Sequence, residues 1–189
     1  IDEVRVYGRV LTAEEVKALY KSSAVKFQNP TNLGLVGYWS FNEGTSTQST
    51  TPFADDYSGN NNKGTLTNMA SPPSSTSGWA NGIRGRALNF DGSDDVVDAG
   101  SGAVLDNVFS NGGTIAAWIY PRAFGEGSIG RIADKTSGGA SAEDGWHFSV
   151  NNVLTPLQSI VFARGYSGDN GVWGTPANSM VLNAWHHVA

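Results

Sequence analysis

Apolar and polar residues alternate over many short stretches of this chain, a pattern typical of β-strands. In the first stretch, IDEVRVY (1–7), Ile1, Val4 and Val6 stand among polar neighbours. Comparable patterns recur in GLVGYWSFNEG (34–44), GTL (64–66), RALNFDGSDDVVDAG (86–100), GGTIAAWIYPR (112–122), GRIADKT (130–136), GWHFSVNN (145–152), SIVFARG (159–165) and AWHHVA (184–189). Turn residues separate these stretches, so the pattern predicts an all-β, antiparallel sandwich or barrel of short strands.

One helix is expected, over residues 12–20. Thr12 is a good N-cap, and Glu15 follows three residues later, as in a capping box. Leu11 and Val16 have the spacing of a hydrophobic staple across the helix start. Strand, connection and helix are therefore specified locally at the start of the chain.

Two segments lack a period. Residues 21–33 are predicted to form a linker, and residues 69–82, rich in Ser, Pro and Gly, a surface loop. The composition agrees with a β-rich fold, because only 15% of the 189 residues are charged while 24 are Gly and 11% are aromatic. This length suits one domain, or one domain and part of another.

The net charge of −5, with no basic cluster in the sequence, argues against nucleic acid as a partner. No apolar run approaches the length of a membrane span, so no membrane insertion is expected. There is no Cys, which excludes disulfides and thiol catalysis and is neutral about the compartment.

Five motifs in order carry a family resemblance: GLVGYWSFNEG, DDYSGNNNKGTL, GRALNFDGSDDVVDAG, GTIAAWIYPR and WHHVA. They resemble laminin-G-like, concanavalin A-like jelly-roll domains of the bacterial and phage variety, and IDEVRVYGRVLTAEEVKALY resembles the closing strand and helix of that family. The resemblance implies an incomplete jelly-roll β-sandwich with one short N-terminal helix. Residues 1–20 would close a preceding repeat, 21–33 would be a linker, and 34–189 would be a repeat truncated at its C-terminal end.

The family's closing strand lies beside its opening strand, which suggests a second possibility for the N-terminal segment. A linker of about thirteen residues spans about 40 Å when extended. We therefore expect Ile1–Tyr7 to fold back and pair near Gly34–Phe41, because an open sheet edge beside aromatic residues is costly.

The resemblance also implies a structural calcium ion, held by an acidic loop and by the acidic residue of the closing strand. These positions correspond to Asp56, Asn60 and Asp2, with Glu43 as a further ligand. Oxygen ligands from irregular loops suit this cation. The alternative is that Asp56 to Asn60 form only a turn stabilised by their own backbone.

A second acidic loop, Asp91-Gly92-Ser93-Asp94-Asp95, lacks the ligand spacing of an EF-hand. Because Asp-Gly is a strong hairpin motif, we expect a hairpin turn joining two strands.

Catalysis is not expected. The chain lacks the run of paired carboxylates used by sugar-cleaving enzymes of this fold and lacks a Gly-x-Ser-x-Gly elbow. Glu143 and Asp144 would point to opposite faces of a strand, and His147, His186 and His187 show no metal-ligand spacing.

Sugar rings stack on exposed aromatic faces and accept or donate hydrogen bonds at nearby polar groups. The richest stretch for this chemistry is expected in a loop, and its candidate ligand-binding residues are Arg164, Tyr166, Asp169 and Trp173. The alternative is packing in the core or at its rim, as expected for Trp39, Phe41, Phe90 and Trp118.

The resemblance therefore implies a non-catalytic carbohydrate-binding or adhesion module of an extracellular protein, which is secreted or displayed on a cell surface or virion. Its partners would be a glycan or a cell-surface protein, together with neighbouring domains of the same polypeptide. The alternatives are a structural spacer in a tandem array and an accessory module of a polysaccharide-degrading enzyme. Two or more exposed aromatic rings on a concave face or at a loop end would favour binding, whereas aromatic side chains that are all buried would favour the spacer.

Overall fold

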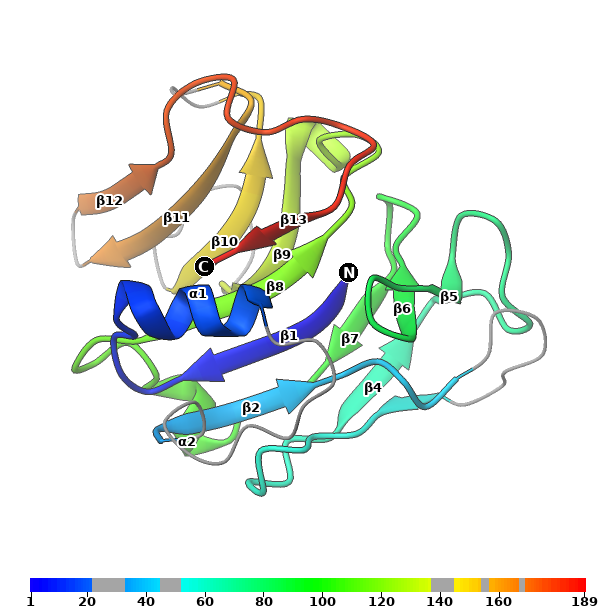
Figure 1. Cartoon of the computed structure of the whole chain (residues 1–189), viewed down its shortest axis with the longest axis horizontal. Coiled ribbons are helices and arrows are strands. Elements are labelled where there is room, and N and C mark those ends of the chain that lie inside the picture. The colour runs from blue at the N-terminus through cyan, green and yellow to red at the C-terminus, as the bar shows by residue number, and fades with distance from the viewer. Residues whose placement is uncertain (22–32, 45–51, 137–144, 154–156, 167–168) are drawn as a thin grey trace. The chain divides into compact units, whose positions relative to one another are not determined.

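The computed structural model describes residues 1–21, 33–44, 52–136, 145–153, 157–166 and 169–189 (Figure 1). The chain divides into two compact units, one of Ile1–Trp118 with His187–Ala189 and one of Ile119–His186. The linker predicted at 21–33 falls almost wholly outside the described residues, as do Glu143 and Asp144.

The elements of the first unit are β1 (Asp2–Tyr7), α1 (Ala13–Lys21), β2 (Leu35–Trp39), β3 (Phe53–Ala54), β4 (Gly64–Thr67), β5 (Gly78–Asn81), β6 (Arg86–Asn89), β7 (Val96–Asp98), α2 (Ala103–Asp106), β8 (Thr114–Ile119) and β13 (His186–Val188). The second unit holds η1 (Glu126–Ser128), β9 (Ile129–Lys135), β10 (Trp146–Asn151), β11 (Ser159–Tyr166) and β12 (Asp169–Gly174). The strand pairings given for the described part are antiparallel, which confirms the all-β class. Among these residues, no helix is both long enough and apolar enough to cross a membrane.

Strand β1 lies inside a four-stranded sheet of order β13-β8-β1-β2. It pairs with β2 through Val4 and Trp39, and with β8 through Val6 and Ile115. The fold-back of the N-terminal strand is thus confirmed, since β1 lies between β2 and β8 and covers one edge of each. The assignment of residues 1–20 to a preceding repeat stays a prediction.

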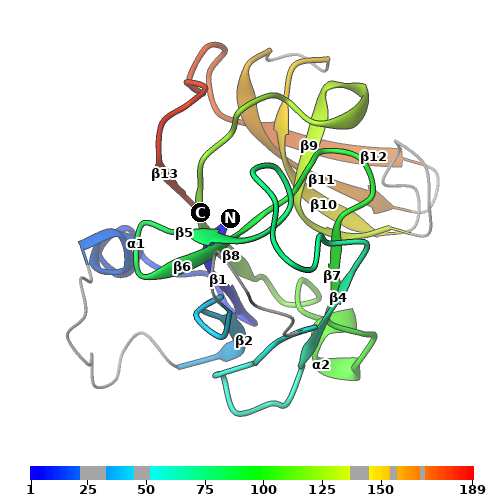
Figure 2. The ribbon, with the colours of Figure 1, turned by 90° about the vertical axis from the view of Figure 1, so that its right-hand side faces the viewer.

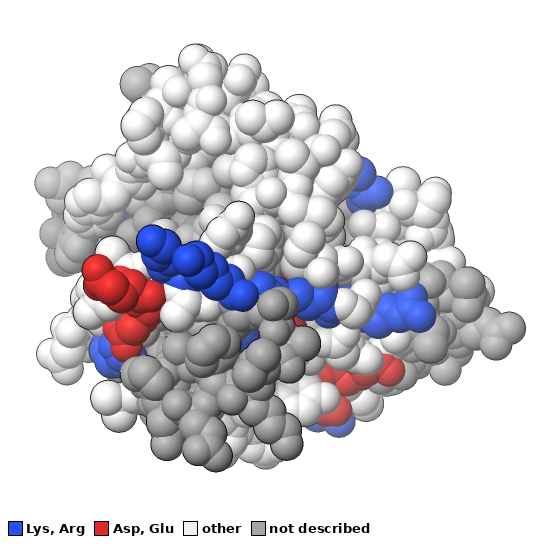
Figure 3. Space-filling view, viewed as in Figure 1, with Lys and Arg blue, Asp and Glu red and all other residues white. Residues whose placement is uncertain are grey.

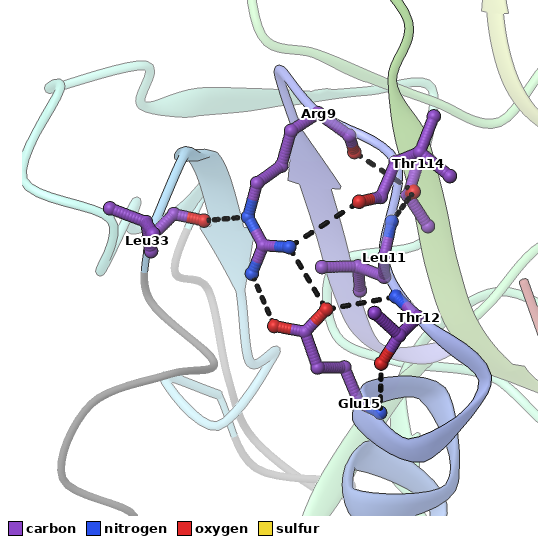
Figure 4. Close-up of polar contacts among 7 residues, drawn as sticks. Arg9, Leu11, Thr12, Glu15, Leu33 and Thr114 are labelled. Atoms are coloured by element: carbon purple, nitrogen blue, oxygen red, sulfur yellow. Dashed lines mark hydrogen bonds and ion pairs between the residues drawn. The ribbon is translucent and has the colours of Figure 1, made fainter.

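Helix α1 begins as the sequence predicts. The Glu15 N–H donates to Thr12 Oγ1 (3.2 Å) and the Thr12 N–H donates to Glu15 Oε2 (2.8 Å), a reciprocal capping box (Figure 4). The Arg9 guanidinium donates hydrogen bonds to both carboxylate oxygens of Glu15 and to the Leu33 carbonyl (2.6 Å). This network connects the helix start to the residues that precede β2.

The apolar side of α1 packs on its own sheet. Leu11 and Leu19 form a buried cluster with Tyr7 of β1 and Ala116 of β8, and Val16 lies against it. The helix is only nine residues long, too short to be stable alone, so this burial supplies much of its stability.

Three core residues predicted from sequence are buried, namely Trp39, Phe41 and Trp118, whereas Phe90 is only partly buried. The Trp39 ring covers Gly37, where any Cβ would collide with it. Its Nε1–H donates to the Asn62 carbonyl (2.8 Å), which satisfies the polar edge of a buried indole.

Two connections differ from the sequence prediction. The Asp91-Gly92 segment does not close a hairpin, because β6 pairs with β5 whereas β7 pairs with β4 in a separate sheet. Part of the loop expected at 69–82 is strand β5. A turn motif determines the local backbone conformation, but it does not determine which strand each flanking strand pairs with.

The second unit contains one antiparallel sheet of order β12-β11-β10-β9, whose strands lie side by side in Figures 1 and 2. Strand β12 was expected to be part of a loop, yet all six of its residues pair with β11, from Val161 opposite Gly174 to Tyr166 opposite Asp169. This hairpin positions Phe162, Arg164 and Trp173 on one face of the sheet.

Candidate functional site

Three aromatic side chains form a row across β10, β11 and β12. Residues directly opposite each other in an antiparallel pair share a face of the sheet, as do residues two apart in one strand. Phe162 lies opposite Trp173, and Trp146 lies opposite Arg164, two residues after Phe162. The ring centroids of Trp146 and Phe162 are 6.4 Å apart, and those of Phe162 and Trp173 are 6.1 Å apart.

Exposure increases along this row toward the sheet edge. Trp146 and Phe162 are partly buried, whereas Trp173 on the outermost strand is 53% exposed. Such a large exposed apolar surface is uncommon for Trp and marks a candidate contact site.

A glycine sets the position of the exposed ring. The Trp173 indole extends back over Gly171, and any Cβ at Gly171 would collide with the six-membered part of that ring. Gly171 lies opposite Arg164, so the indole is held close to the guanidinium-bearing position of β11. The strand therefore keeps the ring against its own backbone.

The structure brings two of the four predicted ligand-binding residues together on this face, Arg164 and Trp173. Tyr166 and Asp169 pair at the end of the same hairpin, but their side chains lie outside the described part. Sequence reasoning missed Phe162 and Gly171. Their spacing of two residues from Arg164 and Trp173 could have indicated that they share a face with those residues if both segments form strands.

An exposed indole and a partly buried arginine on the same face of the sheet offer two kinds of contact. The indole presents an apolar face of the size of a pyranose ring. Arg164 carries up to five N–H donors in a rigid fork, which suit hydroxyl and ether oxygens. Two partly buried rings already hold the outer ring in place. Binding at this row would therefore immobilise few additional side chains and would cost little conformational entropy.

The predicted calcium residues occupy different environments. Asp56 Oδ1 accepts from the N–H groups of Tyr38 (2.9 Å) and Ser58 (2.8 Å), and Oδ2 accepts from Ser58 Oγ (2.9 Å) and the Asn62 N–H (2.9 Å). Although burial opposes its charged form, these hydrogen bonds lower the pKa of Asp56. Protein donors already satisfy this carboxylate.

Asn60 turns its amide nitrogen toward β2, donating to the carbonyls of Leu35 (3.2 Å) and Val36 (3.0 Å). Together with Asp56, it pins the 56–62 loop to strand β2. Both residues thus make the hydrogen bonds expected of a turn, and the calcium assignment stays a prediction.

Asp2 and Glu43 have oxygens left over. Asp2 is fully buried, and its Oδ2 accepts from the Arg84 N–H (3.0 Å) while Oδ1 has no partner. Burial raises the pKa of Asp2 to about 6. Both Glu43 carboxylate oxygens are buried and have no hydrogen-bond partner. Burial raises the pKa of Glu43, and the nearby Tyr57 hydroxyl offsets part of this rise without forming a hydrogen bond of good geometry.

These four residues are not gathered into one cluster. Among the described acidic and histidine residues, the group whose ligand atoms all lie within 4.8 Å is Asp91, Asp94 and Asp95, in the loop between β6 and β7. In this loop the Ser93 N–H donates to Asp91 Oδ1 (2.8 Å), as in an ordinary Asx turn, and the Asp91 N–H donates to Asp95 Oδ2 (2.9 Å).

The three histidines occupy separate environments. His147 is buried in the second unit with Nδ1 3.2 Å from Ser149 Oγ, and His186 Nε2 lies 2.8 Å from the Val181 carbonyl. His187 packs in the first unit against Trp118 (5.3 Å between centroids), and burial, with Arg5 and Arg84, lowers its pKa to about 4.

Comparison with protein-family models, with curated proteins and with solved structures yields no match to this chain.

Proposed function

We propose that this chain is a non-catalytic carbohydrate-binding module, and that the Trp146–Phe162–Trp173 row with Arg164 is the surface that contacts the sugar. The observation that carries the proposal is the 53% exposure of Trp173 on a ring held in place by Phe162 and Gly171. A sugar ring that covers this indole removes apolar surface from water, worth about 25 cal/mol per Å².

The wider interpretation belongs to the same proposal. The order of the five sequence motifs supports a laminin-G-like jelly roll, and the antiparallel all-β class is consistent with it. A module of this kind serves a secreted, cell-surface or virion protein, where glycans and cell-surface proteins are accessible, and it leaves catalysis to other domains. Fold class alone does not carry function, so the proposal depends on the aromatic row.

A structural spacer is the competing interpretation. A spacer needs no exposed aromatic rings, so exposed rings count against it. In the described part, exposed aromatic side chains other than Trp173 include Tyr20, Phe53, Tyr57 and Tyr120. The aromatic side chains of the described part are therefore not all buried, which weighs against the spacer.

The direct test is a glycan array probed with the wild-type chain and three variants. Trp173→Ala removes the exposed ring, and Gly171→Ala keeps every ring but pushes the indole away from its position. Tyr57→Ala is the matched control, because it removes a similarly exposed aromatic (56%) from the other unit.

We expect glycan signals that fall at least tenfold with Trp173→Ala, fall by a smaller factor with Gly171→Ala, and persist with Tyr57→Ala. An array without any wild-type signal, or signals that Trp173→Ala leaves intact, would remove the proposal and leave the spacer.

We keep the structural calcium ion as a proposal, and its candidate ligands are Asp2 or Glu43, each of which has a buried oxygen without a hydrogen-bond partner. Asp56 suits a cation less well, because the ion would compete with the hydrogen bonds that its oxygens accept. A calcium-dependent rise in melting temperature that Glu43→Gln weakens supports the ion, and a melting temperature unchanged by calcium or by chelator refutes it.

A further inference from the structure

Basic side chains gather on one face of the first unit. Figure 3 shows them as a blue band over α1 and the β5–β6 hairpin, with acidic side chains at the α1 end of the band. Lys17 and Lys21 are exposed and four residues apart on α1, so they share a helix face about 6 Å apart along the axis. The last turn of α1 lies next to the turn between β5 and β6, because Arg84 of that turn contacts Tyr20.

Arg84 continues the line from the helix to the hairpin. Its guanidinium donates to the Tyr20 carbonyl (2.9 Å), which places it directly beside the last turn of α1. Its charge also faces His187, where Arg84 and Arg5 add to the effect of burial in lowering the pKa. Positive charges thus gather here in a chain whose net charge is −5.

Acidic neighbours do not neutralise this line. In the described part of the chain, the ion pairs join Arg5 to Glu3, Arg9 to Glu15, Lys63 to Asp55 and Arg131 to Asp134. Lys17, Lys21 and Arg84 stand outside these pairs. On the helix itself, Glu14 lies three residues before Lys17, and Glu15 is occupied by Arg9.

An aromatic ring accompanies the three cations. Tyr20 is 54% exposed and stacks on Trp118 with ring centroids 5.4 Å apart, and the Arg84 guanidinium lies 5.8 Å from the Trp118 ring centroid. The surface thus combines a supported, solvent-facing ring with a row of cations that lie outside the ion pairs of the described part.

We propose that Lys17, Lys21, Arg84 and the Tyr20 ring form a second binding surface, which takes a polysaccharide carrying carboxylate or sulfate groups. Regularly spaced anions pair with the three cations, and a sugar ring between them covers Tyr20. The choice of a polysaccharide over another polyanion rests on the proposed function, whereas the anion binding itself does not.

The test measures binding of the full chain to alginate, which carries carboxylates, to dextran sulfate, and to neutral dextran, over a range of NaCl concentrations. A single-stranded DNA oligonucleotide serves as a polyanion without the sugar surface of a polysaccharide. We expect alginate, dextran sulfate or both to bind at 20 mM NaCl, with neutral dextran and DNA at least tenfold weaker. Which of the two binds identifies the anionic group.

Lys17→Ala/Lys21→Ala is the principal variant, because both side chains are exposed. It should weaken polyanion binding about tenfold at low salt and reduce the salt dependence by one to two released counterions. Lys63→Ala, which removes an exposed lysine elsewhere in the same unit, should leave binding unchanged. Tyr20→Ser should weaken polysaccharide binding more than DNA binding.

The two binding proposals fail separately. Trp173→Ala, which tests the aromatic row, should leave polyanion binding intact, and the double lysine variant should leave the glycan-array signals of neutral sugars intact. Absence of polyanion binding at 20 mM NaCl overturns this second surface, as does binding that the lysine variant does not weaken. Tighter binding of DNA than of either polysaccharide also overturns it.

Discussion

At the scale of single residues, the structure uses small and polar residues to hold aromatic or backbone groups in place. Gly171 makes room for Trp173 as Gly37 does for Trp39, but one indole is half exposed while the other is buried. The same local device therefore serves a candidate contact surface in one unit and a core in the other.

The Asp56 carboxylate is expected to be the main polar support of the 56–62 loop. Asp56→Ala leaves the N–H groups of Tyr38, Ser58 and Asn62 without their acceptor, so we expect unfolding free energy to fall by about 2–4 kcal/mol. Chemical denaturation measures this change.

The adjacent Asp55 provides the control, because it is exposed and makes one surface ion pair with Lys63 (3.3 Å). Asp55→Ala should cost less than about 1 kcal/mol. Equal losses for the two variants would contradict the role assigned to Asp56.

Sequence alone predicted part of the candidate site at this scale. Trp173 and Arg164 stand out because aromatic and guanidinium side chains in a polar stretch are unusual. Phe162 and Gly171 were missed, because their value comes only from the register of β11 against β12, which one sequence does not encode locally.

At the scale of elements, prediction succeeded where the determinants lie within a few residues. Helix α1 forms where Thr12 and Glu15 predict it, since a capping box acts over one turn. Strand β12 was missed because Asp, Asn and Gly in DNGVWG suggest a turn, and pairing with β11 overrides that preference. The destinations of β6 and β7 were missed for a similar reason, since sheet membership is a non-local property.

The cap of α1 can be tested directly. Thr12→Ala removes the acceptor of the Glu15 N–H, and we expect a loss of about 1 kcal/mol in unfolding free energy. Thr12→Ser, which keeps the hydroxyl, should retain most of the stability. A Thr12→Ala variant as stable as the wild type would show that the packing of Leu19 and Leu11 alone holds the helix.

At the scale of the whole molecule, residues distant in sequence complete the central sheet. Strand β1 and strand β13 come from opposite ends of the chain, and both belong to the sheet that contains β8. The fold-back of β1 was predictable because the motif resemblance implied adjacent opening and closing strands. The division into two units was not, because no composition change marks residue 119.

This sheet should lose stability in mild acid through His187. The folded state lowers the His187 pKa from 6.5 to about 4, mainly by burial and also through Arg5 and Arg84. Below pH 6.5 the unfolded chain binds a proton at His187 that the folded chain excludes, so the contribution of His187 to stability decreases as the pH falls from 6.5 to 4. The loss amounts to about 2–3 kcal/mol at pH 4.

His187→Phe should keep the edge-to-face packing on Trp118 and remove this titration. Denaturation curves of both proteins at pH 7, 5.5 and 4 give the comparison. The stability advantage of the variant should grow as the pH falls, and an advantage that is constant with pH would contradict the assignment.

The measurement that tests the central claim most directly follows the indole N–H resonances of the six tryptophans during titration with a glycan that the array identifies. Trp173→Phe assigns the decisive resonance. If the aromatic row binds sugar, the Trp173 resonance shifts most and Trp146 shifts with it, while Trp39, Trp79 and Trp118 of the other unit stay in place. A saturable shift confined to the indoles of that other unit, with Trp173 unmoved, would contradict the claim.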